Sequence, residues 1–262
     1  MTQTLKNLAK KLPQPLPEIL NAIFNFLLKL KIIILEKIPF TNEQKKKYWL
    51  THIYQEHNFS ARERIFLSIA RFCHVNRPIE GYYFEFGCHG GNTMKMAYNH
   101  FRFLFNWDYV AFDSFEGLPE IQEIDKQEIW KKSKLKTDEN EFRSMMIKHG
   151  IPPEKLILVK GFYDESLDEK LKNKLLPKKA AAIYIDCDLY TSTVPVLEFI
   201  KDFLQKGTII VFDDWNCFHA DPEKGERRAF KEFREKYPTL QFEEFISTHE
   251  AKSFVFLGEL NK

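Results

Sequence analysis

Two pairs of aspartates follow apolar runs in the second half of this sequence. The pairs are Asp186 with Asp188, after the run 181–185, and Asp213 with Asp214, after the run 208–212. Carboxylate oxygens suit a hard cation, and Mg²⁺ takes a few of them while keeping positions open for water or substrate. Without a metal, close carboxylates would repel each other and raise each other's pKa, as catalytic acid/base pairs do. The pairs therefore predict a magnesium site, with a metal-free carboxylate dyad or a capped turn as alternatives.

A glycine-rich turn lies upstream of these pairs. The apolar segment 82–86 runs into residues 87–91, Gly-Cys-His-Gly-Gly, and a helical segment follows over 94–100. Glycines let the backbone approach a ligand closely, and the helix start offers free N–H groups to a carboxylate or phosphate. Glu85, at the strand end, can accept a hydrogen bond from an ammonium group. The turn predicts a cofactor loop, although structural turns and other nucleotide cofactors use the same device.

The next apolar run ends at an acidic residue. Asp113 follows the run 109–112 and lies about twenty residues beyond the loop, where the ribose of a nucleoside cofactor needs an acceptor. A turn or helix cap is the structural alternative for this residue. A dinucleotide would use the same two features, so an NAD(P)-dependent oxidoreductase is an alternative function. The sequence lacks the third glycine at the spacing of a dinucleotide-binding motif, and the paired aspartates have no role in hydride transfer. Both observations argue against the oxidoreductase.

These residues all follow predicted strands that alternate with helices. The predicted strands are 82–86, 109–112, 156–160, 181–185, 208–212 and 253–257. Such alternation predicts an α/β fold with a doubly wound, mostly parallel sheet, whose ligands bind at the carboxyl ends of the strands. The long charged segment 120–140 lacks strand and turn signals, and it predicts a lid or an insertion.

The N-terminal part of the chain has a different pattern. Apolar residues recur at helical spacing over 16–35, but charged and amide residues interrupt them, which predicts an amphipathic helix rather than a membrane span. Packing against the protein or a second subunit is favoured over peripheral membrane contact, and a homo-oligomer is expected. A further helix is predicted over 60–75. We therefore expect a helical extension over 1–77 and a catalytic domain over 78–262.

Composition narrows the class of function. The 39 basic and 37 acidic side chains nearly cancel, which argues against a nucleic-acid partner and favours a small-molecule substrate. The four cysteines are far apart in sequence, as expected for reduced, mostly buried thiols. The first residues do not follow the pattern of a secretory signal, so a cytoplasmic location is expected.

Five segments carry a family resemblance. They are 85–91 (Glu-Phe-Gly-Cys-His-Gly-Gly), 112–119 (Phe-Asp-Ser-Phe-Glu-Gly-Leu-Pro), 161–167 (Gly-Phe-Tyr-Asp-Glu-Ser-Leu), 185–193 (Ile-Asp-Cys-Asp-Leu-Tyr-Thr-Ser-Thr) and 211–215 (Val-Phe-Asp-Asp-Trp). They resemble the signatures of the macrocin O-methyltransferase type, which are class I methyltransferases acting on sugars. The resemblance implies a seven-stranded Rossmann-like sheet and S-adenosylmethionine as cofactor.

The resemblance also implies roles for individual residues. The residues expected to bind the cofactor are Glu85, Gly87, Gly91 and Thr93 with their loop neighbours Cys88 and His89 for the methionine moiety, Asp113 for the ribose, Ser114, Phe162 and Tyr163 for the adenine, and also Asp186. His89 departs from the class I pattern because it replaces the middle glycine, so Gly90 is expected to make the tight turn. Arg227 and Arg228 match a basic segment near the acceptor site, and a solvated helix face is the alternative for them.

Catechol O-methyltransferases also place acidic or amide ligands after these two strands. By that analogy Asp186, Asp213 and Asp214 hold the metal, and Asp188 is the candidate general base. The roles of Asp186 and Asp188 could be exchanged, since positions two apart on a strand share a face. An aliphatic hydroxyl is a poor nucleophile at neutral pH, and chelation to a dication lowers its pKa. The sequence predicts a Mg²⁺-dependent O-methyltransferase acting on a sugar or glycosylated small molecule, with metal-independent methyl transfer as an alternative.

Overall fold

The computed structural model describes residues 41–76, 79–132 and 135–260, together with residues 26, 27, 29, 30 and 33. Contacts divide the chain into two compact units, residues 1–59 and 60–262. Most of the predicted helix over 16–35 lies outside the described residues, and the division predicted between 77 and 78 stays a prediction. No helix in the described ranges is both long and apolar enough to cross a bilayer.

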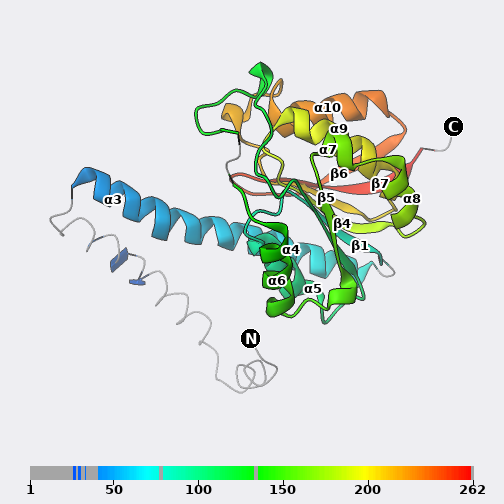
Figure 1. The fold of residues 1–262 in the computed structure, drawn as a ribbon, viewed down its shortest axis with the longest axis horizontal. Coiled ribbons are helices and arrows are strands. Elements are labelled where there is room, and N and C mark those ends of the chain that lie inside the picture. The colour runs from blue at the N-terminus through cyan, green and yellow to red at the C-terminus, as the bar shows by residue number, and fades with distance from the viewer. Residues whose placement is uncertain are drawn as a thin grey trace. The chain divides into compact units, whose positions relative to one another are not determined.

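The larger unit is built on a seven-stranded sheet with the order β3-β2-β1-β4-β5-β7-β6 (Figure 1). Its strands are β1 (Tyr82–Phe86), β2 (Asp108–Asp113), β3 (Leu156–Lys160), β4 (Ala180–Ile185), β5 (Ile209–Phe212), β6 (Leu240–Ser247) and β7 (Lys252–Glu259). The first five strands are parallel, and β7 pairs antiparallel with both β5 and β6. The predicted fold class, a mostly parallel doubly wound sheet, is confirmed.

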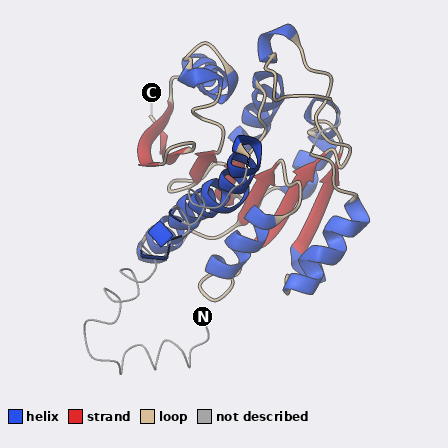
Figure 2. Cartoon of the chain, turned by 90° about the vertical axis from the view of Figure 1, so that its left-hand side faces the viewer, coloured by secondary structure: helices blue, strands red, loops and turns tan. Residues whose placement is uncertain are grey.

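Helices cover both faces of this sheet (Figures 1 and 2). One face carries α4 (Gln55–Val75), α5 (Asn92–Phe101) and α6 (Glu139–His149), and the other carries α7 (Tyr163–Ser166), α8 (Glu169–Leu175), α9 (Tyr190–Ile200) and α10 (Gly225–Lys236). Successive residues of a strand point to opposite faces, so in β1 Tyr83 enters the core on one side and Phe84 the core on the other. Both faces are buried, which is why the central strands are continuous apolar runs.

The strand β6 is absent from the sequence-based assignment. It forms the edge of the sheet beside β7, and its side chains are only partly buried, with Glu243 and Glu244 exposed. Charged residues are common on edge strands because they discourage pairing with other chains. The same charges remove the apolar run by which the other strands were identified.

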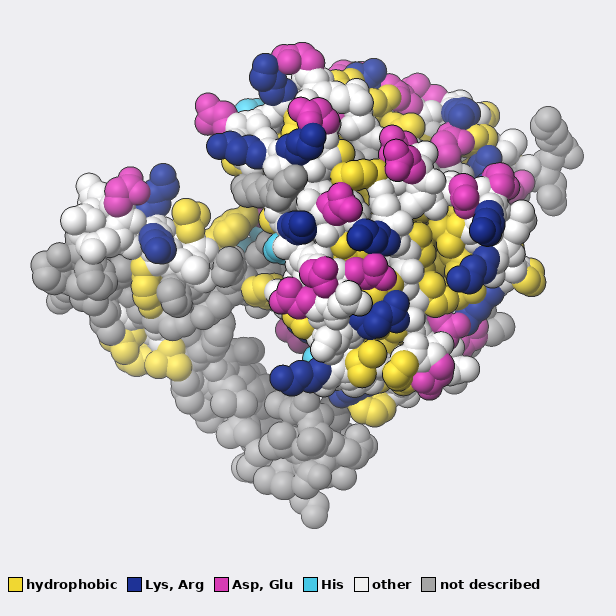
Figure 3. Space-filling view, viewed as in Figure 1, with side chains coloured by type: hydrophobic (Ala, Val, Ile, Leu, Met, Phe, Trp, Pro, Cys, Tyr) yellow, Lys and Arg dark blue, Asp and Glu magenta, His cyan; other side chains and the backbone are white. Residues whose placement is uncertain are grey.

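The smaller unit contains α3 (Asn42–Tyr48), followed by a π-helical segment Trp49–Tyr54. Thr41 caps α3 in a capping box with Gln44, in which each side chain bonds the backbone N–H of the other residue. On the larger unit, Figure 3 shows acidic and basic side chains intermingled over the visible face. This mixture agrees with the nearly balanced charge of the sequence.

The insertion predicted over 120–140 is a long connection that ends where α6 begins at Glu139. It contains a short 3-10 helix, Glu123–Asp125, and the side chain of Asp125 is fully buried. The Asp125 carboxylate accepts hydrogen bonds from the backbone N–H groups of Tyr190 (2.7 Å) and Thr191 (3.1 Å) and from the Thr191 hydroxyl (2.6 Å). Asp125 therefore caps the start of α9 from a distant part of the chain.

Replacing Asp125 by alanine should lower the free energy of unfolding by about 1 to 3 kcal/mol, because the substitution leaves buried donors at the start of α9 without their acceptor. Urea unfolding of the variant against the wild type measures this loss. Glu123→Ala is the matched control, since the Glu123 side chain is 86% exposed and pairs only with exposed Lys126 among the ion pairs of the described residues. Equal losses in both variants would contradict the capping role.

Candidate active site

The turn after β1 has the geometry of a ligand loop. Gly87, His89 and Gly91 adopt φ values of +82°, +34° and +68°. A Cβ on Gly87 would lie 1.8 Å from the backbone oxygen of Asp186, so only glycine allows β1 and β4 to approach there. Gly90 lies with His89 at the centre of the tight turn 88–91, which the Gly91 N–H closes by donating to the Cys88 carbonyl at 2.7 Å. The left-handed backbone positions of this turn are His89 and Gly91, and a Cβ on Gly90 would meet no atom within 4 Å.

Asp113 ties this loop to the end of β2. One carboxylate oxygen accepts from the backbone N–H groups of Cys88 (2.7 Å) and His89 (3.1 Å), and the other accepts from that of Phe115 (2.7 Å). These bonds use three of the roughly four acceptor positions of a carboxylate. Asp113 therefore holds the shape of the loop, and its role toward a ribose stays a prediction.

Glu85 is fully buried at the end of β1. Its Oε2 accepts a hydrogen bond from the Tyr83 hydroxyl at 2.5 Å, whereas its Oε1 is buried without a hydrogen-bond partner. Burial raises the pKa of this carboxyl from 4.5 to about 8, and the Tyr83 bond and the charge of Arg62 only partly oppose the rise. A buried acceptor without a partner fits an ammonium group such as that of the predicted cofactor.

The pKa of Glu85 predicts a pH-dependent stability. Because the folded-state pKa is raised, the protonated carboxyl stabilises the fold fully below pH 4.5, and this contribution is lost as the pH rises through about 8. The free energy of unfolding of the wild type should therefore fall, relative to that of Glu85→Gln, across this window. Urea unfolding of both proteins at several pH values, without cofactor, makes the comparison. Parallel curves would show that Glu85 is already ionised in the fold.

The remaining predicted cofactor residues follow the carboxyl ends of β1, β2 and β3. Thr93 is buried in the first turn of α5, and Phe162 precedes α7 as its N-terminal cap. The Ser114 hydroxyl donates to the carbonyl of Gly117 (2.7 Å) and closes a turn, while the Tyr163 hydroxyl donates to the carbonyl of Phe112 (3.2 Å). These positions are compatible with contacts to a nucleoside, but the individual roles stay predictions.

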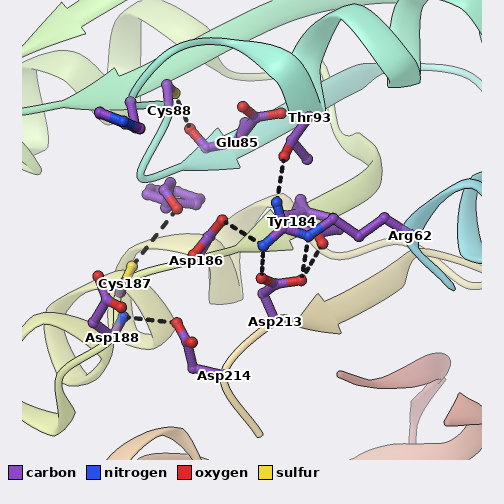
Figure 4. Close-up of polar contacts among 12 residues, drawn as sticks. Arg62, Glu85, Cys88, Thr93, Tyr184, Asp186, Cys187, Asp188, Asp213 and Asp214 are labelled. Atoms are coloured by element: carbon purple, nitrogen blue, oxygen red, sulfur yellow. Dashed lines mark hydrogen bonds and ion pairs between the residues drawn. The ribbon is translucent and has the colours of Figure 1, made fainter. Parts of the chain in front are cut away.

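Three of the four predicted aspartates converge at the ends of β4 and β5 (Figure 4). Each of Asp186, Asp188 and Asp214 offers one carboxylate oxygen, and these oxygens all lie within 4.8 Å of one another. The backbone N–H of Asp188 also donates to the Asp214 carboxylate at 3.2 Å. Asp188 has a left-handed backbone, with φ of +60°, which aspartate tolerates better than most residues. An oxygen-only donor set of this kind fits a hard divalent cation.

Asp213 is held differently from these three. Its carboxylate accepts two hydrogen bonds from the guanidinium of Arg62 and one from the Tyr184 hydroxyl, and only 4% of its side chain is exposed. The same guanidinium lies 3.6 Å from the Asp186 carboxylate. The structure thus gathers Asp186, Asp188 and Asp214, whereas the predicted ligand set of Asp186, Asp213 and Asp214 would need the Arg62–Asp213 pair to change.

A fifth carboxyl group adjoins the cluster. Glu226, at the start of α10, is 1% exposed; its Oε2 accepts from the backbone N–H of Asp214 at 3.0 Å, and its Oε1 has no partner. Sequence reasoning missed Glu226 because an acidic residue in the first turn of a helix is ordinary. It also missed Arg62, which is a polar residue in a long helix and has no motif around it.

The carboxylates in this cluster resist ionisation. Burial, and then the charges of neighbouring carboxylates, raise the pKa of Asp186, Asp214 and Glu226 well above the usual range. A nearby dication would reverse this effect by stabilising the charged forms. Clustered carboxylates are therefore costly unless a positive charge lies close to them.

Arg227 and Arg228, at the start of α10, hold local structure. Arg227 donates to the backbone carbonyl of Trp215 (2.6 Å) and to the Asn216 side chain. Arg228 pairs with Glu232 at 2.7 Å, and its guanidinium lies 4.8 Å from the ring centre of Tyr190. Arg227 therefore fixes the loop after β5, next to the aspartates, and the contacts of Arg228 are those of a helix face.

The comparisons with known proteins agree with this geometry. Residues 72–241, well over half of the chain, match the family described as macrocin O-methyltransferase. The chain belongs to the macrocin O-methyltransferase family. It is therefore an S-adenosylmethionine-dependent O-methyltransferase. The family match excludes the alternative of an NAD(P)-dependent oxidoreductase. A search of curated proteins found no match.

Solved structures support the fold of this family member. The O-methyltransferase NovP is similar with a TM-score of 0.60 and 17% identity, over 76% of this chain and 80% of NovP. The calicheamicin methyltransferase CalS11 is similar with a TM-score of 0.59 and 20% identity, over 86% of this chain and 89% of CalS11. An O-methyltransferase from Bacillus cereus, solved in complex with SAH, gives a TM-score of 0.50 and 12% identity over 81% of this chain and 96% of its own.

Proposed function

We propose that this methyltransferase transfers the methyl group of S-adenosylmethionine to a hydroxyl of a sugar or glycosylated small molecule, with Mg²⁺ held beside the cofactor crevice. The observation that carries the metal is the convergence of three carboxylates within 4.8 Å at the ends of β4 and β5. The sugar acceptor rests on the family match and on CalS11, one structure of which is described as a TDP-rhamnose 3'-O-methyltransferase.

Asp186 and Asp214 are the proposed metal ligands, since both belong to the observed cluster and to the predicted set. The third position is proposed for Asp213, once it is released from Arg62, with Asp188 as the competing candidate. A bound Mg²⁺ would chelate the acceptor hydroxyl and lower its pKa. Glu226 would keep the Asp214 backbone in place through its 3.0 Å hydrogen bond.

The chain's own residues then account for the rest of the reaction. The loop 87–91 and Glu85 would hold the methionine moiety of the cofactor, and Asp113 would hold its ribose. Asp188 takes the proton of the acceptor hydroxyl as the oxygen bonds the methyl carbon. When bound, the cofactor would supply the methyl group and would keep the electron pair of the broken carbon–sulfur bond, becoming the neutral thioether.

A methyl-transfer screen tests this function. The purified protein, labelled S-adenosylmethionine and Mg²⁺ are incubated with nucleotide-sugars, glycosylated natural products and lipopolysaccharide sugars. We expect label in a sugar acceptor, with no transfer to the same sugar lacking the methylated hydroxyl. Transfer confined to non-sugar phenols would overturn the sugar proposal while leaving the methyltransferase intact.

A further inference from the structure

Arg62 connects three groups of the site that come from different elements. It extends from α4 between the cofactor loop and the carboxylates (Figure 4). Its guanidinium donates to Asp213 from Nε (3.1 Å) and from one terminal nitrogen, and this terminal nitrogen lies 3.6 Å from Asp186. The other terminal nitrogen donates to the Thr93 hydroxyl at 3.3 Å. The Arg62 side chain is only 19% exposed, so these contacts largely replace its hydration.

The buried guanidinium of Arg62 offsets the negative charges of Asp213 and Asp186, which would otherwise destabilise the fold. The charge of Asp213 contributes to the raised pKa of Asp186, and unpaired buried carboxylates are strongly destabilising. Arginine stays protonated in proteins and its planar fork binds two oxygens of one carboxylate at once. Arg62 thus supplies a fixed positive charge to the cluster in the protein without metal.

We propose that Arg62 is a built-in counter-cation of the carboxylate cluster, which competes with the divalent metal for Asp213 and Asp186 and so weakens metal binding. This inference rests on the metal site of the proposed function. Arg62 donates hydrogen bonds to Asp213, which is a predicted metal ligand. Its positive charge would also repel a dication bound at the neighbouring Asp186. The guanidinium would have to give up Asp213 before that residue could become a metal ligand.

The direction of the effect follows from two contributions of the same sign. Removing the Arg62 charge removes the repulsion between guanidinium and dication, which is substantial between partly buried charges. At a pH at which both carboxylates are ionised, it also leaves Asp213 and Asp186 uncompensated in the metal-free state, so metal binding relieves more repulsion than before. Both contributions tighten metal binding, and an ordinary structural role for Arg62 would loosen it.

Calorimetric titration of Mn²⁺ into the metal-free protein, without substrate, tests this directly. Arg62→Gln removes the charge but keeps an amide that can donate to Asp213. We expect its Kd for Mn²⁺ to fall by about tenfold or more relative to the wild type, as partial removal of a charge repulsion allows. Arg64→Gln is the matched control, because Arg64 is exposed on the same helix, and its Kd should equal that of the wild type.

Thermal unfolding with and without Mg²⁺ gives a second measurement that does not depend on calorimetric heats. We expect Arg62→Gln to have a lower Tm than the wild type without metal and a larger rise in Tm on adding Mg²⁺. Unchanged or weaker metal binding in Arg62→Gln, with a wild type that binds the ion, would overturn the counter-cation role alone. A wild type that binds neither ion would overturn the metal site and this inference with it.

Discussion

Replacing Asp188 by asparagine is expected to lower kcat by about 10²- to 10⁴-fold, the usual cost of losing a general base. Asparagine keeps the size of the side chain and tolerates the left-handed backbone at this position, where φ is +60°. Its amide, however, cannot accept the proton of the acceptor hydroxyl. Single-turnover methyl transfer with saturating cofactor measures the loss, and calorimetry should show that S-adenosylmethionine still binds.

The matched variant is Asp214→Asn, which removes a proposed metal ligand. Raising the Mg²⁺ concentration should partly restore its turnover, because a weakened site fills at higher metal concentration, but should leave Asp188→Asn inactive. If added Mg²⁺ instead restored Asp188→Asn, Asp188 would be the third ligand, as its place among the converging carboxylates allows. If Asp186→Asn kept its metal but lost turnover, then Asp186 and Asp188 would exchange roles.

Removing the metal is the second change with a large expected effect. Dialysis against a chelator should abolish turnover with an aliphatic hydroxyl, because the acceptor loses the ion proposed to lower its pKa. Binding of S-adenosylmethionine should persist, since its methionine and ribose moieties are assigned to the loop 87–91, Glu85 and Asp113 and not to the metal ion. Activity assays and calorimetry on the same metal-free sample separate the two steps.

Restored activity on adding Mg²⁺ back excludes irreversible damage by the chelator. Mn²⁺ should also restore activity, because it accepts the same oxygen ligands, whereas a monovalent salt at equal ionic strength serves as the negative control. Full turnover in metal-free protein would support the alternative of a metal-independent methyltransferase. In that case the cluster would act as a carboxylate dyad, and the raised pKa of Asp186 and Asp214 would be its physical basis.

Six of the seven strands and the outline of the cofactor loop could be predicted from the sequence. Central parallel strands are buried on both faces, so each must be a short apolar run, and the runs at β1 and β4 coincide with the strands. Ligands of such sheets bind at the carboxyl ends of the strands, which is why Glu85, Asp113 and the aspartate pairs are the candidate site residues. The strand β6 was not predicted from the sequence because an exposed edge strand does not require an apolar run.

The contacts among the polar side chains of the site could be seen only in the tertiary structure. Asp213 and Asp214 are neighbours in the sequence, but their side chains have different partners. Asp214 lies close to Asp186 and Asp188. Asp213 accepts hydrogen bonds from Arg62 and Tyr184. No local sequence signature marks three further features: the left-handed residues of the cofactor loop, the cap of α9 by Asp125, and the hydrogen bond from the Asp214 N–H to Glu226. Their contacts join segments far apart in the chain, and such contacts depend on how helices pack across the sheet. Local residue patterns report propensity and burial, and they do not encode which distant partner a polar side chain will reach.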